Sequence, residues 1–581
     1  MSEWFAKNVR ESLYGSDLER AQQVEAKTLA QARTALVSPG VRAELKRLAK
    51  TPDEAALIGT LLEAEDDVAF CVALDQLRAH MLVTGANGVG KTFIVILMLV
   101  EALTKKKAAA ITVFDMKGEL AELLTTRVLP AIAMSLTGSE RDAFLDRIVV
   151  IDPFAKDLLP PLDILVRDPS IPIAVQAQDI AECFDVATDA GSGIRMETIL
   201  HWLLRLVIEV GGSFHVVRRA LEEPALIDVL ARHSKDPDVA RYFLLRYPQE
   251  PRSSKLALLA RLDRFLGLPA TRRCLAARKC VSFDKLLENR ITIVNLGTAD
   301  AGLHSIAVFF ATMLLTRCVR AIFRRPHHGT EPALLIADEW QLALTPALAQ
   351  EWENVLALAR SRNVFAWLVN QQLVQLDKHG QDLRKIVVGQ TAVHVAFRMA
   401  AEDSQVHRHL FPATGLMPRP KPPLGRELQG SPFLSPAEER EARASGATTL
   451  PPRTAYWFDK RGGSALLLRS ATVKLPLEKD LPRDVVARTR TGTLTMRARD
   501  LDQKITDENT ALDQLLQRAR SAVPVKASAP VAPVVPSSSV TPPAVPAPSV
   551  LPAMPSTPPT PAPAAPPKRR RRRGKGAPNL G

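Results

Sequence analysis

Short apolar runs separated by amphipathic stretches dominate the chain from about residue 80 onward. Continuous apolar runs predict strands buried on both faces, and apolar residues spaced three and four apart predict the helices between them. The predicted strands are Met81–Thr84, Ala110–Asp115, Ile148–Asp152, Ile291–Leu296, Ala333–Asp338, Val364–Asn370 and Ala392–Phe397. This alternation predicts an α/β core, with a mostly parallel sheet covered by helices on both faces.

Other segments depart from this alternation. Residues from about Trp4 to Ala69 are rich in Ala, Leu, Glu, Lys and Arg at helical spacing, which predicts a helical N-terminal region. Residues 171–289 are amphipathic at helical spacing and predict an all-α domain inserted into the sheet. Two apolar runs around Arg461-Gly462-Gly463 predict a β-hairpin. Beyond about Val523 the sequence is rich in Pro, Ala and Ser, which predicts a disordered tail.

The length of 581 residues is several times that of a usual domain, so we expect one core with additional parts. The predicted parts are a helical N-terminal region at 1–75, the first half of the core at 76–170, the inserted all-α domain at 171–290, the second half of the core at 291–475, a helical C-terminal extension at 476–522 and the Pro-rich tail at 523–581.

Cysteine usage and hydropathy bear on the cellular compartment. The five cysteines are scattered and have no spacing typical of a zinc site, so we expect them to be reduced and mostly buried. Residues 1–5 lack the start of a secretory signal. The longest apolar runs, Phe93–Val100 and Ile306–Thr316, are shorter than the roughly 18 residues of a membrane span. We therefore expect a cytoplasmic protein with no transmembrane segment of its own, located at the inner membrane only through a partner.

The net charge of +14 is concentrated at the C-terminus, because Lys568, Arg569 to Arg573 and Lys575 supply seven positive charges. The rest of the chain is only mildly basic, so charge alone does not predict a nucleic-acid partner for it. The basic end could bind nucleic-acid phosphates, bind an anionic membrane surface, or only keep the tail soluble. The sequence leaves these three alternatives open.

One segment has the complete pattern of a phosphate-binding loop, and it lies between a predicted strand and a predicted helix. Its residues are Gly85, Ala86, Asn87, Gly88, Val89, Gly90, Lys91 and Thr92. The glycines let backbone N–H groups surround a phosphate at a helix N-terminus, where the helix dipole favours negative charge. We expect Lys91 to contact the β- and γ-phosphates of ATP and Thr92 to ligate Mg²⁺.

A nucleotide-hydrolysing site also needs an acidic strand end, and Asp338 and Glu339 provide it after the apolar run 333–337. A strand of this kind belongs at the sheet centre, so both carboxylates should emerge at the edge where open α/β sheets bind ligands. Asp338 then suits the Mg²⁺ shell and Glu339 the general base. An Asp-Glu pair that only caps a helix is the alternative.

Two further segments could complete the site. Gln371 follows the strand at 364–369 and could detect the γ-phosphate, although such an amide can also simply close a turn. Arg360 and Arg362 precede the same strand and could neutralise phosphate charge across a subunit boundary, although an exposed helix end is the simpler interpretation.

The order of these segments resembles that of the TraG/TraD-type coupling proteins, which belong to the HerA/FtsK superfamily of ring-shaped motors. The resemblance spans roughly Ala79 to Met399. It rests on the phosphate-binding loop and on the segments Phe114–Leu120, Ile151–Phe154, Val294–Gly297, Asp338-Glu339, Gln371–Leu376 and His379-Gly380. The Asp-x-Lys-Gly-Glu-Leu and Gln-x-x-x-Gln-Leu segments are the most specific of these. Members of this family usually begin with transmembrane helices, whereas we expect a helical region without a membrane span at the start of this sequence.

The resemblance implies a RecA-like P-loop ATPase that assembles as a homo-hexamer and uses ATP and Mg²⁺. It implies that Arg360 is a trans-acting arginine finger and Gln371 the sensor of the γ-phosphate. The implied function is to recruit relaxase-bound, single-stranded DNA and pump it through a type IV secretion channel during conjugation, with a channel or membrane subunit as partner. Two alternatives are a HerA-like motor in DNA repair or phage defence and an ATP-dependent platform that recruits proteins.

Overall fold

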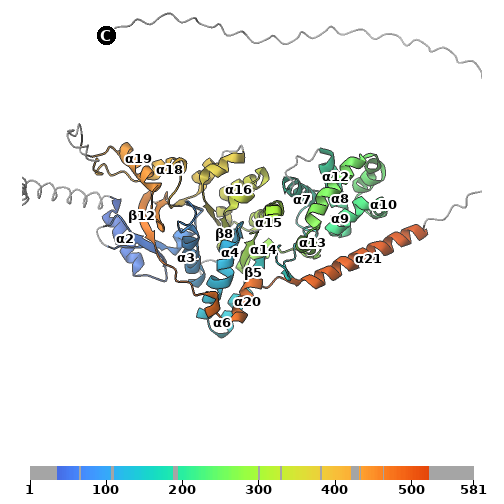
Figure 1. The fold of residues 1–581 in the computed structure, drawn as a ribbon, viewed down its shortest axis with the longest axis horizontal. Helices are drawn as coiled ribbons and strands as arrows, with labels where there is room; N and C mark the ends of the chain where they lie inside the picture. The colour runs from blue at the N-terminus through green and yellow to red at the C-terminus, as the bar shows by residue number, and fades with distance from the viewer. Residues whose placement is uncertain are drawn as a thin grey trace, which may run out of the picture. The chain divides into compact units, whose positions relative to one another are not determined.

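The computed structural model describes residues 36–522, apart from 65–66, 106–109, 188–193, 299–300, 328–329, 380–382, 420–430, 432 and 462. These residues belong to one compact unit. The predicted tail at 523–581 lies outside the described residues, and so do residues 1–35 of the predicted helical N-terminal region. Figure 1 shows the described part, with the sheet strands flanked by helices.

A mixed sheet organises the described residues, with the strand order β2-β1-β12-β11-β10-β3-β9-β8-β4-β7-β5. The strands from β10 to β5 run parallel, and β11, β12, β1 and β2 are added antiparallel at one side. The bounds are β1 Ala55–Leu61, β2 Ala69–Ala73, β3 Met81–Thr84, β4 Ala110–Asp115, β5 Ile148–Ile151, β7 Ile291–Asn295, β8 Ala333–Asp338, β9 Val364–Asn370, β10 Val393–Ala396, β11 Thr454–Asp459 and β12 Ser464–Ser470.

The seven predicted strands are present, and the hairpin of β11 and β12 is present as well. Two apolar cores explain why the parallel strands are continuous apolar runs. Leu334 and Ile336 of β8 belong to one core, and Leu335 and Ala337 belong to the other. Since alternate side chains of a strand point to opposite faces, both faces of the sheet are buried. The predicted α/β core is therefore confirmed.

Most of the helices around the sheet pack into these two cores, while Ala444 and Ala447 of α19 belong to a smaller core with Tyr456 and Phe458 of β11. The first core includes α3 and the segment that follows β4, and the second includes α15 and α16. The bounds are α3 Lys91–Thr104, α4 Glu119–Leu123, a π-helical turn Leu124–Val128, α5 Leu129–Ser135, α6 Gly138–Asp146, α15 His304–Arg324, α16 Pro346–Leu358, α17 Leu383–Gln390, α18 Ala401–His407, α19 Pro436–Ala447 and α20 Arg483–Thr491.

The prediction of a helical region over residues 1–75 is wrong for its last third. Helix α2 spans Pro39–Ala49, but β1 and β2 then form an antiparallel pair that joins the main sheet. Ala56 and Ile58 are buried while Leu57 between them is 46% exposed, which is the alternation of a strand. Strand β1 pairs with β12, about 400 residues later in the chain, so its partner could not be read from the local sequence.

The insertion between β6 (Leu158–Leu159) and β7 is helical in its described elements, as predicted. Its helices are α7 Ile173–Ala187, α8 Ile194–Val210, α9 Phe214–Glu222, α10 Pro224–Arg232, α11 Pro237–Arg241, α12 Arg252–Leu266, α13 Pro269–Leu275 and α14 Phe283–Asn289. The two chain segments that connect this insertion to the core pair with each other through a bridge between Leu162 and Cys280.

A long C-terminal helix, α21 (Ala498–Ala522), packs against this insertion (Figure 1). Leu501, Leu512 and Leu516 bury its apolar side. Ion pairs hold its polar side, between Arg273 and Asp502 at 2.8 Å, between Arg278 and Glu508 at 2.6 Å, and between Arg219 and Asp513. The short strand β13 (Met496–Arg497) leads into the helix and pairs with β6.

Helix α15 is, among the described residues, the one helix long and apolar enough to cross a membrane. Its most apolar 18-residue window is 83% buried inside the protein. A core helix of a large α/β domain meets the same criteria, because it too is apolar on most of its surface. In this fold α15 packs under the sheet as part of the second core.

Candidate active site

The segment Gly85–Gly90 forms the loop between β3 and α3, as predicted. Gly85, Gly88 and Gly90 have φ values of +151°, +72° and +111°, which L residues rarely adopt. The Lys91 ammonium donates hydrogen bonds to the carbonyl oxygens of Gly85 at 2.8 Å and Ala86 at 3.0 Å. Burial lowers the pKa of Lys91, and the nearby carboxylates of Glu339 and Asp338 oppose that shift.

Two segments beyond the predicted site hold this loop in place. The Ala86 N–H donates to the carbonyl of Arg398 at 2.8 Å, just after β10. The Arg453 N–H donates to the carbonyl of Val89 at 2.7 Å, just before β11, and Arg453 itself has a φ of +66°. Neither contact could be found from sequence, because each joins the loop to a segment more than 300 residues away.

Asp338 and Glu339 lie where the sequence predicted them, at the carboxyl end of β8. Both side chains are buried, with residue exposures of 5% and 4%. Asp338 is level with Asp115 on the neighbouring strand β4. Burial, followed by the negative charges of Asp115 and Glu339, raises the pKa of Asp338 to about 8. A carboxyl group in this state favours an added positive charge nearby.

Three side chains donate hydrogen bonds to the Glu339 carboxylate. Gln371 Nε2 lies 2.9 Å and Lys117 Nζ lies 3.2 Å from Oε1, and Gln341 Nε2 lies 2.5 Å from Oε2. Only Gln371 among these donors was predicted. Glu339 has a φ of +52°, so an unusual backbone conformation places its side chain.

The strand order explains how Gln371 reaches this carboxylate. Strand β9 lies between β3, which carries the phosphate-binding loop, and β8, which carries the acidic pair. Gln371 follows β9 directly, so its amide sits between the two. Asn370 at the end of β9 is buried and accepts a 2.7 Å hydrogen bond from the indole N–H of Trp340. The end of β9 is thereby fixed against the segment that follows Glu339.

Arg360 is not close to these residues. It lies in the 3-10 turn Ala359–Arg362 immediately before β9, at the amino ends of the parallel strands. Its positive charge contributes, after burial, to lowering the pKa of His80 at the start of β3. A seven-residue strand spans about 20 Å, so Arg360 is at the opposite edge of the sheet from the phosphate-binding loop. It cannot contact a nucleotide bound to its own chain.

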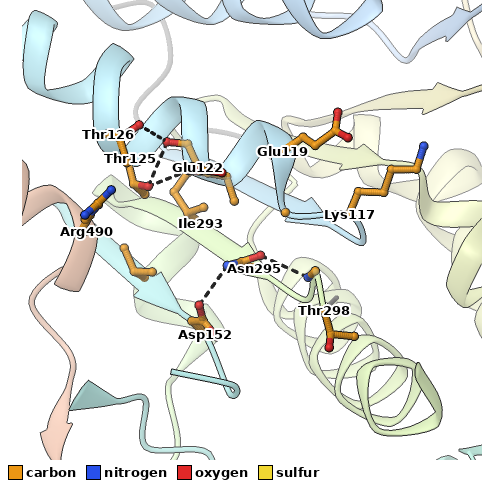
Figure 2. Close-up of a pocket in the computed structure, with 14 residues that line it drawn as sticks. Lys117, Glu119, Glu122, Thr125, Thr126, Asp152, Ile293, Asn295, Thr298 and Arg490 are labelled. Carbon is orange, nitrogen blue, oxygen red and sulfur yellow. Dashed lines mark hydrogen bonds between the residues drawn. The ribbon is translucent and has the colours of Figure 1, made fainter. Parts of the chain in front are cut away.

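Three of the segments that carried the family resemblance meet beside the acidic pair. They follow β4, β5 and β7 and line a cavity of about 500 Å³. Figure 2 shows Lys117 and Glu119 at one side of this cavity, and Asp152 hydrogen-bonded to Asn295 at another. That hydrogen bond measures 2.9 Å. From the sequence these segments indicated only the family resemblance, and their residues had no predicted role.

The residues present fit a nucleotide with its metal ion. The loop glycines leave space, since a Cβ on Gly88 would have no protein atom within 4 Å. Among the described residues the hydrogen-bond partners of the Lys91 ammonium are two carbonyls of its own loop, and a phosphate would replace them. Thr92 lies half-buried in the first turn of α3, and Asp338 lies two strands away at the same edge. The donor set of a hydroxyl and a carboxylate is the one Mg²⁺ prefers.

Comparison with known proteins gives one family and several solved structures. Residues 56–314, a little under half of the chain, match the family described as helicase HerA, central domain (DUF87). No curated protein sequence matches the chain.

Solved structures similar to this chain include the bacterial conjugative coupling protein TrwB, at 14% identity over 75% of this chain and 93% of that one, with a TM-score of 0.45. VirB4 of Thermoanaerobacter pseudethanolicus is 12% identical over 72% of this chain and 97% of that one, with a TM-score of 0.46. TrwB in complex with ADP and Mg²⁺ is 15% identical over 74% and 92%, with a TM-score of 0.44.

The family match covers the phosphate-binding loop and most of the parallel strands. Asp338, Glu339 and Gln371 lie outside the matched residues, and the strand order brings them to the same sheet edge as the loop. Residues 56–314 are thus similar to the central domain of the helicase HerA, in agreement with the group that the sequence resemblance indicated.

Proposed function

We propose that this protein is a ring-forming motor that hydrolyses Mg·ATP to move DNA, and that its work is the transfer of relaxase-bound single-stranded DNA through a type IV secretion channel. The observation that carries the ATPase part is the hydrogen bond from Gln371 to Glu339. It joins the predicted sensor to the predicted base, at the strand end next to the phosphate-binding loop.

The residues divide the reaction between them. A Mg²⁺ ion held at this site would supply positive charge that offsets the negative charge developing on the phosphates. Lys91 and the loop N–H groups hold the phosphates, and Thr92 and Asp338 would hold the metal ion. Glu339 accepts a hydrogen bond from the attacking water and orients it. Gln371, which donates to Glu339, is placed to detect whether a γ-phosphate is present.

Assembly supplies the residue that the single chain lacks. Arg360 is exposed and lies at the opposite edge of the sheet from its own loop. In a head-to-tail ring this edge can face the nucleotide of the next copy. We propose that Arg360 acts there as the arginine finger of a homo-hexamer, and that ring closure therefore precedes fast hydrolysis.

The experiment is steady-state ATP hydrolysis by the full chain, without DNA and with single- or double-stranded DNA. Wild type should hydrolyse ATP and respond to DNA, while Lys91→Ala should show no turnover. Lys46→Ala, at an exposed position on α2, is the matched control and should behave as wild type. Turnover by Lys91→Ala at the wild-type rate would contradict the site assignment.

A second candidate function is a HerA-like DNA motor that acts with a nuclease in repair or defence. The family description, helicase HerA, favours it directly. The two functions share the same ATPase residues, so motor variants do not separate them. Co-purification does: a relaxase supports the conjugative function, and a nuclease supports the second.

A further inference from the structure

Lys117 contacts Glu339 from the side of the acidic pair that faces away from the phosphate-binding loop. It follows β4, and the strand order from the loop outward is β3, β9, β8 and β4. Adjacent strands lie about 4.8 Å apart, so roughly 14 Å separates β3 from β4. The Lys117 ammonium reaches the Glu339 carboxylate from this side and lies 3.2 Å from Oε1.

The backbone of Lys117 is held firmly. Asp115 Oδ1 accepts hydrogen bonds from the N–H groups of Lys117 and Gly118, both at 2.9 Å. The Lys117 carbonyl packs against Gly297, where an added Cβ would lie 2.3 Å from the oxygen. Because the backbone is fixed on both sides, the position of the ammonium depends on its side chain alone.

The Glu339 carboxylate has little capacity left for a water molecule. Each carboxylate oxygen accepts about two hydrogen bonds. Oε1 already accepts two, from Lys117 and Gln371, and Oε2 accepts one from Gln341. The ion pair also draws the carboxylate toward β4. One acceptor position therefore remains, on Oε2, and the ion pair at Oε1 restrains the orientation in which the carboxylate presents it to a water molecule.

If the Lys117 ammonium leaves Glu339, the cavity that Lys117 lines offers it space and other carboxylates. Lys117 lines the cavity of about 500 Å³ described above, and its side chain is 31% exposed. Glu119, Glu122 and Asp152 also line this cavity (Figure 2), so alternative carboxylate partners are present. The lysine can thus exchange Glu339 for another anionic partner while its backbone stays fixed.

We propose that Lys117 is a positioning residue that restrains Glu339 in the resting enzyme, so that fast ATP hydrolysis requires displacement of its ammonium from Oε1. The inference rests on the proposed ATPase function. Lys117 is the switchable contact, and DNA engagement by the motor is the event that displaces it.

The test compares kcat and KM for ATP in wild type, Lys117→Met and Lys117→Arg, with and without single-stranded DNA. Loss of one partly exposed ion pair corresponds to a rate change of about fivefold. Lys117→Met should raise the DNA-free kcat by about that factor at unchanged KM, and DNA should stimulate it less than wild type. Lys117→Arg keeps a cation near Glu339 and should stay close to wild type.

The comparison of the Met and Arg variants shows whether the charge of Lys117 restrains Glu339, because only the Met variant removes the ion pair. An unchanged or lower DNA-free kcat in Lys117→Met overturns the proposal, and so does equal behaviour of the Met and Arg variants. If the Met variant is unstable in a thermal melt, Lys117→Gln, which also removes the charge, takes its place.

Failure of the proposed function gives a different result. If Lys91→Ala retains turnover, the hydrolysis does not come from this site and the ATPase assignment fails. If wild type hydrolyses ATP but ignores DNA, the DNA motor fails, while the comparison of DNA-free kcat values still decides the role of Lys117.

Discussion

Replacing Gly85 by alanine tests how the phosphate-binding loop is built. Gly85 has a φ of +151°, and a Cβ added there would lie 2.7 Å from Phe397 Cβ and 3.2 Å from the Arg398 carbonyl oxygen. The first contact involves a Cβ and the second a backbone atom, so no rotamer change relieves either. Gly88 provides a matched control, since it has a φ of +72° and no atom within 4 Å of an added Cβ.

The magnitudes follow from these two environments. An alanine at Gly88 incurs the left-handed backbone cost of about 1–2 kcal/mol and nothing more. An alanine at Gly85 incurs a backbone cost of about 1–3 kcal/mol and overpacking of about 1–3 kcal/mol. Gly85→Ala should therefore destabilise the protein by about 2 kcal/mol more than Gly88→Ala. In a unit of this size roughly 1 kcal/mol corresponds to 1 °C in Tm, because unfolding entropy grows with chain length.

The assay is a thermal melt of both variants without nucleotide, followed by a titration with Mg·ADP. Gly85→Ala should melt about 2 °C below Gly88→Ala and should lose the stabilisation that ADP gives to wild type. Phe397→Ala should not rescue Gly85→Ala, because the clashing Cβ remains. Equal melting of the two glycine variants, or rescue by Phe397→Ala, would refute the packing described here.

Three further predictions concern other parts of the chain. Burial, with the charge of Arg360, lowers the pKa of His80 from 6.5 to about 4. The stability that this shift contributes above pH 6.5 should therefore fall by about 2 kcal/mol on acidification to pH 5. Thermal melts at both pH values check this, and His80→Gln should weaken the pH dependence. Leu501→Ala should remove about 2–5 kcal/mol of packing that holds α21 and make residues 498–522 sensitive to limited proteolysis, whereas Leu494→Ala, at a 41% exposed position, should not. Arg360→Ala should lower kcat by about 10³ without changing nucleotide affinity in dilute protein; weaker nucleotide binding there would place the arginine in its own site.

The parallel strands could be predicted because their sequence signal is local. Each is a strand of four to seven mostly apolar residues, and burial on both faces favours that pattern. The phosphate-binding loop and the acidic pair carry equally local signals. Their meeting at one sheet edge follows from the rule that parallel strands bind ligands at their carboxyl ends.

Other features depend on partners far away in the chain and could not be predicted. Strand β1 is a strand because β12 pairs with it, and its own residues also suit a helix. Lys117 belongs to a segment that carried the family resemblance. Its contact with Glu339 could not be predicted, because that contact depends on β4 and β8 being neighbours in the sheet. The hydrogen bond from Arg453 to Val89 likewise joins residues with no local signal between them. Arg360 was predicted as a finger, and the fold places it at the opposite edge of the sheet from the phosphate-binding loop of its own chain.

The central claim is that Glu339 is the catalytic base of a DNA-dependent ATPase. The most direct test is ATP hydrolysis by wild type and Glu339→Gln, with and without single- and double-stranded DNA, with nucleotide binding measured in parallel. Wild-type hydrolysis should rise with DNA, and Glu339→Gln should bind nucleotide yet lose both basal and stimulated turnover. Turnover by Glu339→Gln at the wild-type rate, or wild-type turnover indifferent to both forms of DNA, would contradict the claim.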